Sequence, residues 1–79
     1  MALYFFHLCN GTDLLLDPEG RAVDGLAAVQ AAALRDARSI ISDDASSGRI
    51  RLEYRIEVQD AAGVLVHKIA FEDAVTITR

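Results

Sequence analysis

The stretch that decides the fold of this 79-residue chain is Leu3-Tyr4-Phe5-Phe6-His7-Leu8-Cys9-Asn10-Gly11-Thr12-Asp13-Leu14-Leu15-Leu16. Its first part is apolar, rich in aromatic side chains and too short for a stable helix. Asn10-Gly11 follows directly, and both residues tolerate the positive φ that the central positions of a type I′ turn require. The stretch therefore predicts a β-hairpin with strands over about 3–9 and 12–16.

Turn residues separate this hairpin from a long helix. In Asp17-Pro18-Glu19-Gly20 the proline presets φ and the glycine suits the exit of a turn, whereas residues 21–23 fit either a short extension or a loop. The next segment is rich in alanine, with apolar residues at every third or fourth position. Asp24 is placed to cap its first turn, and Gly48 to end it. We expect a helix over about 25–46, buried mainly through Leu26, Val29, Leu34, Ile40 and Ile41.

Two further strands follow the helix. Residues 51–59 alternate strictly, with Leu52, Tyr54, Ile56 and Val58 on one face and charged or polar residues on the other. Residues 60–63 indicate a turn in which Gly63 forms a bulge. The fourth strand, over about 64–71, should turn Leu65, Ile69 and Phe71 toward the core, with His67 in the same row. Residues 72–79 fit an edge extension or a tail.

The order β-β-α-β-β predicts an α+β fold. Hairpins favour antiparallel pairing, and one helix covers only one face of a sheet. We therefore expect a two-layer sandwich, with an antiparallel four-stranded sheet and one helix, in a single domain over 1–79. Strand order 2-1-3-4 places the most apolar strand centrally and is preferred over 3-4-1-2.

The first strand has more apolar residues than one core requires. One of its faces carries Tyr4, Phe6 and Leu8, and the other carries Leu3, Phe5, His7 and Cys9. Whichever set faces the helix, the other needs cover, which a second copy, another protein or the last eight residues would provide. The interface candidates are Tyr4, Phe5, Phe6, His7, Arg55 and Glu57.

Composition excludes several classes of protein. Hydrophobic residues make up 52% of the chain, which is too many for a disordered segment, yet no apolar run approaches the length of a membrane span. The net charge of −4 argues against nucleic-acid binding. With one cysteine and no sorting signal near Met1, we expect a cytoplasmic protein without an internal disulfide.

The chemical candidates are weak. His7, Cys9 and His67 offer too few ligands with standard spacing for zinc, and Cys9 lies too far from His7 on a strand to act with it as a nucleophile pair. A small-molecule site would need a pocket lined by His7, Tyr54 and His67. Carboxylates around the first turns fit solvated loops, and Arg51 and Arg55 fit ion pairs with Glu53 and Glu57. We expect no catalytic, cofactor-binding or metal-binding residues.

Short segments along the chain match a known pattern: Tyr4-Phe5-Phe6-His7, Asn10-Gly11, Asp17-Pro18-Glu19-Gly20, Ala33-Leu34-Arg35-Asp36-Ala37-Arg38, Arg55-Ile56-Glu57-Val58, Asp60-Ala61-Ala62-Gly63 and Phe71-Glu72-Asp73-Ala74-Val75. Together they resemble a small bacterial family described only as a domain of unknown function. The resemblance spans nearly the whole chain and implies one compact domain in a bacterial cytoplasm, but no activity. The chain departs from that pattern at Ala32 or Ala33, where an acidic residue is usual, and at His67, where an apolar residue is commoner.

We therefore expect a non-enzymatic protein-interaction or structural domain that forms a homodimer or docks on another protein. The hairpin, turn and alanine-rich helix are also similar in architecture to the antitoxin half of bacterial toxin–antitoxin pairs. The alternative is thus an antitoxin-like inhibitor or regulator that binds a basic partner protein. Neither interpretation involves a cofactor, a nucleic acid or a membrane.

Overall fold

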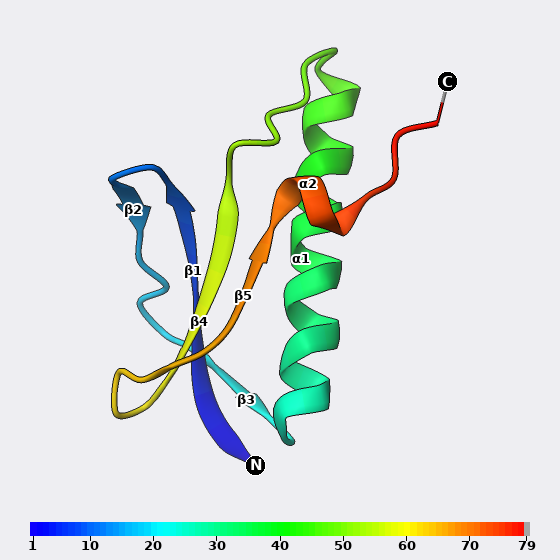
Figure 1. The fold of residues 1–79 in the computed structure, drawn as a ribbon. Helices are drawn as coiled ribbons and strands as arrows, with labels where there is room; N and C mark the ends of the chain where they lie inside the picture. Colours follow the sequence, from blue (N-terminus) through cyan, green and yellow to red (C-terminus); the bar gives the residue numbers. More distant parts are fainter. Residues whose placement is uncertain (79) are drawn as a thin grey trace.

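The computed structural model describes residues 1–78 and has an α+β fold, as expected (Figure 1). Its sheet is antiparallel and has five strands rather than the expected four, because residues 21–23 add a short strand, β3, beside β1. The order β2-β1-β4-β5 of the other four confirms the expected strand order. No helix within residues 1–78 is long and apolar enough to cross a membrane. The elements are β1 (Ala2–Asn10), β2 (Asp13–Leu15), β3 (Arg21–Val23), α1 (Leu26–Ser46), β4 (Arg55–Asp60), β5 (Leu65–Ala70) and α2 (Phe71–Ala74).

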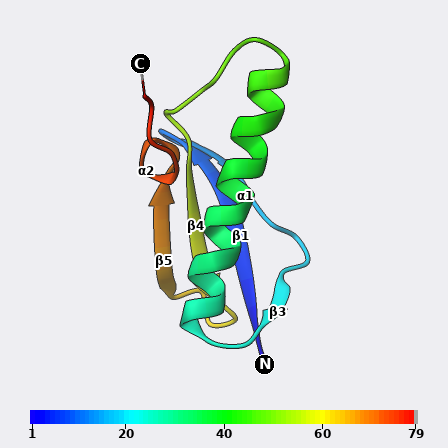
Figure 2. The ribbon, with the colours of Figure 1, turned by 90° about the vertical axis from the view of Figure 1, so that its right-hand side faces the viewer.

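Strand β1 organises the sheet. One of its edges pairs with β4, from Tyr4 opposite Asp60 to Cys9 opposite Arg55. The other edge pairs with two short strands placed end to end, β2 near the hairpin turn and β3 near the chain start. Residues 21–23 are therefore a short strand rather than a loop. Figure 2 shows β5, β4, β1 and β3 side by side behind α1.

The first hairpin turn lies one residue later than expected. Asn10 pairs with Asp13, so the loop consists of Gly11 and Thr12. Gly11 has φ 58°, and no residue other than glycine has positive φ in the part of the chain described. A type I′ turn needs positive φ at both central positions, so that prediction is wrong. Glycine at the first central position is instead the arrangement of a type II′ turn.

The second hairpin confirms the predicted turn and corrects the face of one residue. The Gly63 amide donates to the Asp60 carbonyl at 3.0 Å, and Gly63 has φ 82°. A register shift at Val58/Gln59 then moves Leu65 out of the core, so that it is half exposed while Val66 packs inward. His67 lies opposite Val58, in the row expected for it.

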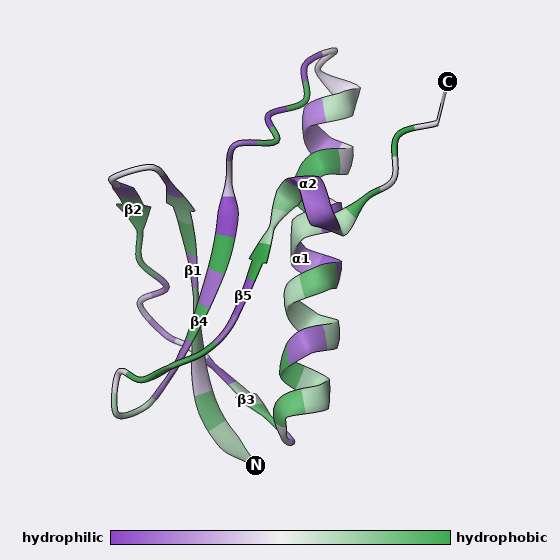
Figure 3. Cartoon of the chain, viewed as in Figure 1, coloured by the Kyte–Doolittle hydropathy of each residue, from purple (hydrophilic) through white to green (hydrophobic). Residues whose placement is uncertain are grey.

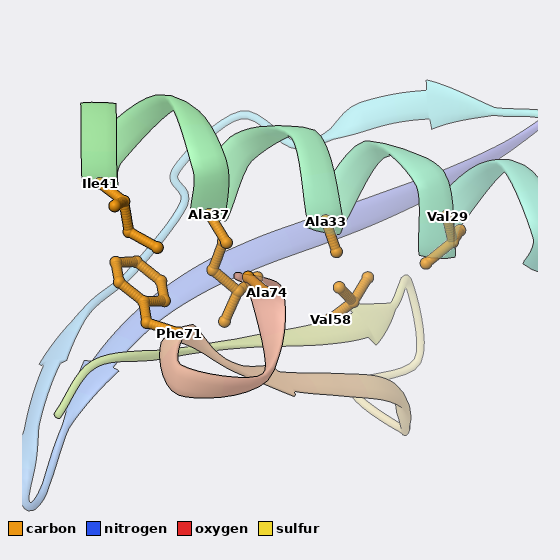
Figure 4. Packing of buried hydrophobic residues seen from close by; sticks show 8 residues of the cluster. Val29, Ala33, Ala37, Ile41, Val58, Phe71 and Ala74 are labelled. Carbon is orange, nitrogen blue, oxygen red and sulfur yellow. The ribbon is translucent and has the colours of Figure 1, made fainter. Parts of the chain in front are cut away.

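The core lies between α1 and the sheet. Figure 4 shows the buried apolar side chains of α1 directed at Val58, Phe71 and Ala74. From β1, the set that faces the helix layer is Tyr4, Phe6 and Leu8. Alanines 33 and 37 are fully buried, and small side chains let the helix approach the sheet closely. The buried residues of α1 are Val29, Ala33, Ala37, Ile41 and Asp44.

Both ends of α1 show how local sequence sets the boundary. The helix is preceded by Gly25 at φ 94° and has no side-chain cap, so the expected Asp24 cap is wrong. Leu26 is half exposed rather than buried. Beyond the helix, Gly48 adopts φ 83°, which confirms its left-handed conformation.

Residues 51–54 are not a strand, because Arg51 turns back to the helix. Its amide and guanidinium donate to the carboxylate of Asp44, with Nη2 and Oδ1 2.9 Å apart. The hydrogen bond from the Arg51 side chain lowers the pKa of Asp44. Leu52 and Tyr54 still pack against the core, as the alternation indicated.

After β5 the chain forms the short helix α2, which packs against α1. Phe71 begins α2 instead of ending a strand, and its ring lies 5.8 Å from that of Tyr54. The Nε of Arg38 donates to the Ala74 carbonyl at 2.8 Å, which ties α2 to α1. The expected edge extension or tail is therefore in part a helical turn, and Arg79 lies outside the described residues.

Phe71→Ala should destabilise the fold by about 3–5 kcal/mol, because it opens a cavity at a fully buried ring. Urea unfolding followed by circular dichroism measures the change. Ile77→Ala is the control, since Ile77 is 68% exposed and should change stability by less than about 0.5 kcal/mol. Equal effects of the two changes would contradict this description of the core.

Candidate functional site

The open edge of the sheet beside β2 carries three adjacent exposed leucines. Leu14, Leu15 and Leu16 are 55%, 69% and 59% exposed. Leu15 lies opposite Leu8 and so shares the helix-side face, whereas Leu14 lies opposite Cys9 and belongs to the outer face. We call these three residues the leucine edge. Figure 3 shows apolar colouring in β2, which forms one edge of the sheet.

The leucine edge borders an apolar hollow on the helix side of the sheet. One shallow pocket of about 270 Å³ lies between Leu8, Leu15 and Tyr54, with Asp13 at its rim. A second of about 200 Å³ continues from Leu8 to Ile40 of α1. The helix thus leaves the β2 side of the sheet open, and the lining of the hollow is apolar at its centre, around Leu8, with polar side chains such as Asp13 and Ser39 beside it.

The turn over residues 17–20 follows the leucine edge directly and holds it beside β1. Asp17 follows the leucines and fills the gap between β2 and β3 along the edge of β1. Its carboxylate accepts hydrogen bonds from the amides of Phe6 and Gly20 at 3.1 Å and of Glu19 at 3.2 Å. Burial opposes ionisation of Asp17, but these three amides together with Arg21 outweigh it and lower the pKa of the carboxyl. The carboxylate thus takes the place of a strand that the turn interrupts.

His7 holds the same turn from the outer face. The Asp17 amide donates to Nδ1 of His7 at 3.1 Å, and Nε2 lies 3.2 Å from Oε1 of Gln59. Because the amide is a donor, Nδ1 must be the acceptor, and the ring proton then lies on Nε2 and points to Gln59. His7 is therefore a buried structural histidine that links β1, β4 and the turn.

The outer face of β1 is largely covered by its own chain. Gly20 lies so close that a Cβ atom there would meet the Phe5 ring and the Tyr4 carbonyl at 3.0 Å. Phe5 stacks on His7, with ring centroids 6.4 Å apart, and Cys9 is buried. The 17–20 turn and polar side chains of β4 thus cover this face, whereas Ala74 and Val75, from the segment expected as cover, pack at the core on the helix side.

The six predicted interface residues lie on two faces. Tyr4 and Phe6 point into the helix layer, whereas Phe5, His7, Arg55 and Glu57 belong to the outer face. Arg55 pairs with Glu57 at 2.6 Å, as expected, but Arg51 pairs with Asp44 and not with Glu53. The sequence interpretation missed the leucine edge, although three successive leucines on a short strand cannot all face one core.

Arg21, which lies near the helix-side hollow, is already paired with an acidic residue. Arg21 forms an ion pair with Asp36 of α1, and its second hydrogen bond, from Nη1 to Oδ1, is 3.3 Å long. The guanidinium also lies over the Phe6 ring, 3.9 Å from its centroid. Through Asp36 and Phe6 this contact adjoins one part of the hollow, whereas the carboxylate of Asp13 lies at the other part.

The candidate chemical groups lie apart from one another. His7 and Cys9 are on the outer face, whereas Tyr54 and His67 belong to the helix side. Within residues 1–78, no three histidine, cysteine or acidic side chains are grouped as metal ligands would be. Burial, and then the charge of Glu57, raise the pKa of Cys9 despite nearby Arg55. A raised pKa keeps the thiol protonated and weakly nucleophilic.

Comparison with known proteins identifies a family but no characterised relative. A model of the Domain of unknown function (DUF6894) matches residues 3–72. No curated protein and no solved structure matches the chain. The match includes β1, the leucine edge, the 17–20 turn, α1 and both later strands.

Gly20→Ala should destabilise the fold more than Gly11→Ala. Both glycines have positive φ, which costs another residue about 1–2 kcal/mol. At Gly20 the added Cβ also meets a backbone oxygen that cannot move easily, whereas nothing lies within 4 Å at Gly11. Thermal unfolding of the two variants checks the order, and an equal loss would show that the turn does not press on β1.

Asp17→Asn should reduce stability by about 1–3 kcal/mol near neutral pH, because the variant loses the charge and one of the two accepting oxygens. The folded-state pKa of Asp17 is below its ordinary value of 3.8. The ionised carboxylate thus stabilises the fold fully above that value, and this contribution is lost as the pH falls through the lowered pKa. Urea unfolding at several pH values should show the gap between wild type and variant closing below about pH 3.8. A gap that does not change with pH would contradict this role.

Proposed function

The chain belongs to the DUF6894 family, and we propose that it is a non-enzymatic protein-interaction domain whose binding surface is the leucine edge. The observation that supports the proposal is the exposure of Leu14, Leu15 and Leu16, each more than half accessible at an unpaired edge of the sheet. Contiguous exposed apolar surface is characteristic of sites that bind other proteins.

The energetics favour burial of this surface by a partner. Apolar surface gains about 25 cal/mol for each Å² removed from water, so three leucines contribute substantially to binding. The supporting structure is already in place, because Asp17 and His7 fix the turn that follows the leucines. A surface that is held before binding loses less conformational entropy when a partner arrives.

The second candidate is an antitoxin-like inhibitor or regulator that binds a basic protein. The observation in its favour is charge, since Asp13 and Glu19 line the pockets beside the leucines and the chain carries −4 overall. Opposite charge at the rim of an interface raises the association rate. This candidate uses the same surface and differs only in the occupant.

Leu15→Glu should abolish association while leaving the fold intact, because Leu15 is 69% exposed and contributes little to the core. Sedimentation equilibrium over a concentration series measures self-association. Affinity capture from an extract of the source cells, compared between wild type and variant, measures binding to other proteins. Circular dichroism confirms folding.

The matched control is Ile77→Glu, which introduces the same charge at a residue of nearly equal exposure, 68%, away from β2. The control should behave as wild type in both measurements. A wild-type chain that stays monomeric and captures nothing that depends on Leu15 would overturn the proposal.

A further inference from the structure

We propose that the occupant of the leucine edge is a second copy of this chain, whose β2 pairs antiparallel with β2 of the first copy. This inference rests on the proposed function and specifies the partner. The result is one continuous sheet that crosses a two-fold axis. Three independent features of the edge support it: the direction of its free backbone groups, the order of its side chains and the position of its charges.

The backbone of β2 offers hydrogen-bonding groups on its open side. In an antiparallel pair, successive residues direct their N–H and C=O groups alternately toward and away from the partner strand. The Phe6 amide points to the β2 side of β1, since it binds Asp17, and Leu8 points the same way. Leu15, opposite Leu8, therefore bonds to β1. The N–H and C=O of Leu14 consequently point away from β1 and toward the open edge.

The side chains are ordered as a self-complementary strand requires. The sequence Asp13-Leu14-Leu15-Leu16-Asp17 reads the same in both directions. Antiparallel pairing centred on Leu15 places it against its own copy and places Leu14 against Leu16, twice. Leu14 and Leu15 point to opposite faces, so an added strand contacts both faces, whereas a helix would cover only one.

The charges permit this register. Pairing about Leu15 brings Asp13 of one copy opposite Asp17 of the other, which would repel if both carboxylates faced the axis. The Asp17 carboxylate is instead turned into its own sheet, where the amides of Phe6, Glu19 and Gly20 hold it. The interaction that completes β1 therefore also directs the charge of Asp17 away from the proposed axis.

The other exposed strands are protected against such pairing. Strand β5 has a register shift near its start, carries the exposed Lys68 and turns directly into α2. Strand β3 is three residues long, begins with Arg21, which is paired to Asp36, and leads into α1. Bulges, charges and short length are the usual devices that prevent edge pairing. Strand β2 is also short and has one exposed charge, Asp13 at its turn end, but its other two residues are exposed leucines and its pairing with β1 shows no register shift.

Hydrogen exchange of single amides tests this pairing in the full chain. In the dimer the Leu14 amide should be protected, and its exchange should accelerate on dilution as the mass measured by sedimentation falls. The Leu15 amide, which bonds to β1, is the internal control and should stay protected at every concentration. Fast exchange at Leu14 in samples that are fully dimeric would overturn the inference, and so would a chain that is monomeric throughout.

A pair of variants tests the same bond. Leu14→Pro removes the outward N–H without touching a bond to β1 and should abolish the dimer. Leu14→Ala keeps that N–H and should weaken the dimer by about tenfold, through lost side-chain contact alone. Equal dimerisation of both variants and wild type would show that the edge is not used.

The results separate this inference from the proposed function. One outcome is a dimer that Leu15→Glu disrupts but in which the Leu14 amide exchanges freely. It would contradict pairing between β2 strands and still support a protein-interaction domain. A monomer that captures another protein through Leu15 would likewise contradict pairing between β2 strands and support a protein-interaction domain. A monomer that captures no protein through Leu15 would contradict both the proposed function and the pairing between β2 strands.

Discussion

The carboxylate of Asp17 completes the sheet at the one place where the chain cannot supply a strand. Strand β1 is nine residues long, but the two strands beside its outer edge are three residues each and leave a gap between them. The Phe6 amide lies in that gap, and a buried amide without a partner costs free energy. Asp17 binds it and at the same time fixes the turn that carries the chain from β2 to β3. The leucine edge, the cover of Phe5 and the orientation of His7 all depend on this residue.

Close packing of α1 imposes the second constraint. Ala33 and Ala37 have no exposed surface, so the helix axis lies near the sheet at these positions. Larger side chains at the helix ends then reach past the alanines to Val58 and Phe71. Because α1 packs on β4 and β5, the β2 side of the sheet is left open. The apolar hollow beside Leu8 is a direct result of where the alanines place the helix.

Much of the architecture could be read from local patterns. Period-two alternation identified the core face of β4, alanine content and spacing identified α1, and two apolar hairpins indicated the strand order. The errors have a common cause, which is that a contact distant in sequence decided the outcome. Arg51 leaves the strand pattern because Asp44 binds it, and Leu65 leaves the core because of a register shift against Gln59. A reading of the chain alone had no signal for either contact.

The candidate site was harder to predict than the fold. The sequence of β1 indicates more aromatic residues than one face of the sheet can bury. The residues on its outer face are covered by the 17–20 turn and held by the hydrogen bonds of His7. The three leucines that follow carry no such signal in the sequence, because consecutive leucines in a short predicted strand are typical of a buried strand. The expected strand order already placed this strand at an edge of the sheet, but only the packing of α1 on β4 and β5 shows that the helix layer leaves it uncovered.

The long-range pairing of β1 also determines when this protein can fold during its synthesis. One edge of β1 pairs with β4, which is synthesised some fifty residues later. Phe6 therefore cannot pair with Val58 until that segment has been made. A ribosome adds about 5–20 residues per second, which leaves an aromatic strand without its main partner for seconds. During that time only the local pairings with β2 and β3 are available to it. The nascent chain therefore carries its most aromatic strand for seconds before β4 exists to pair with it, and the short strands β2 and β3 are the first partners that it can use.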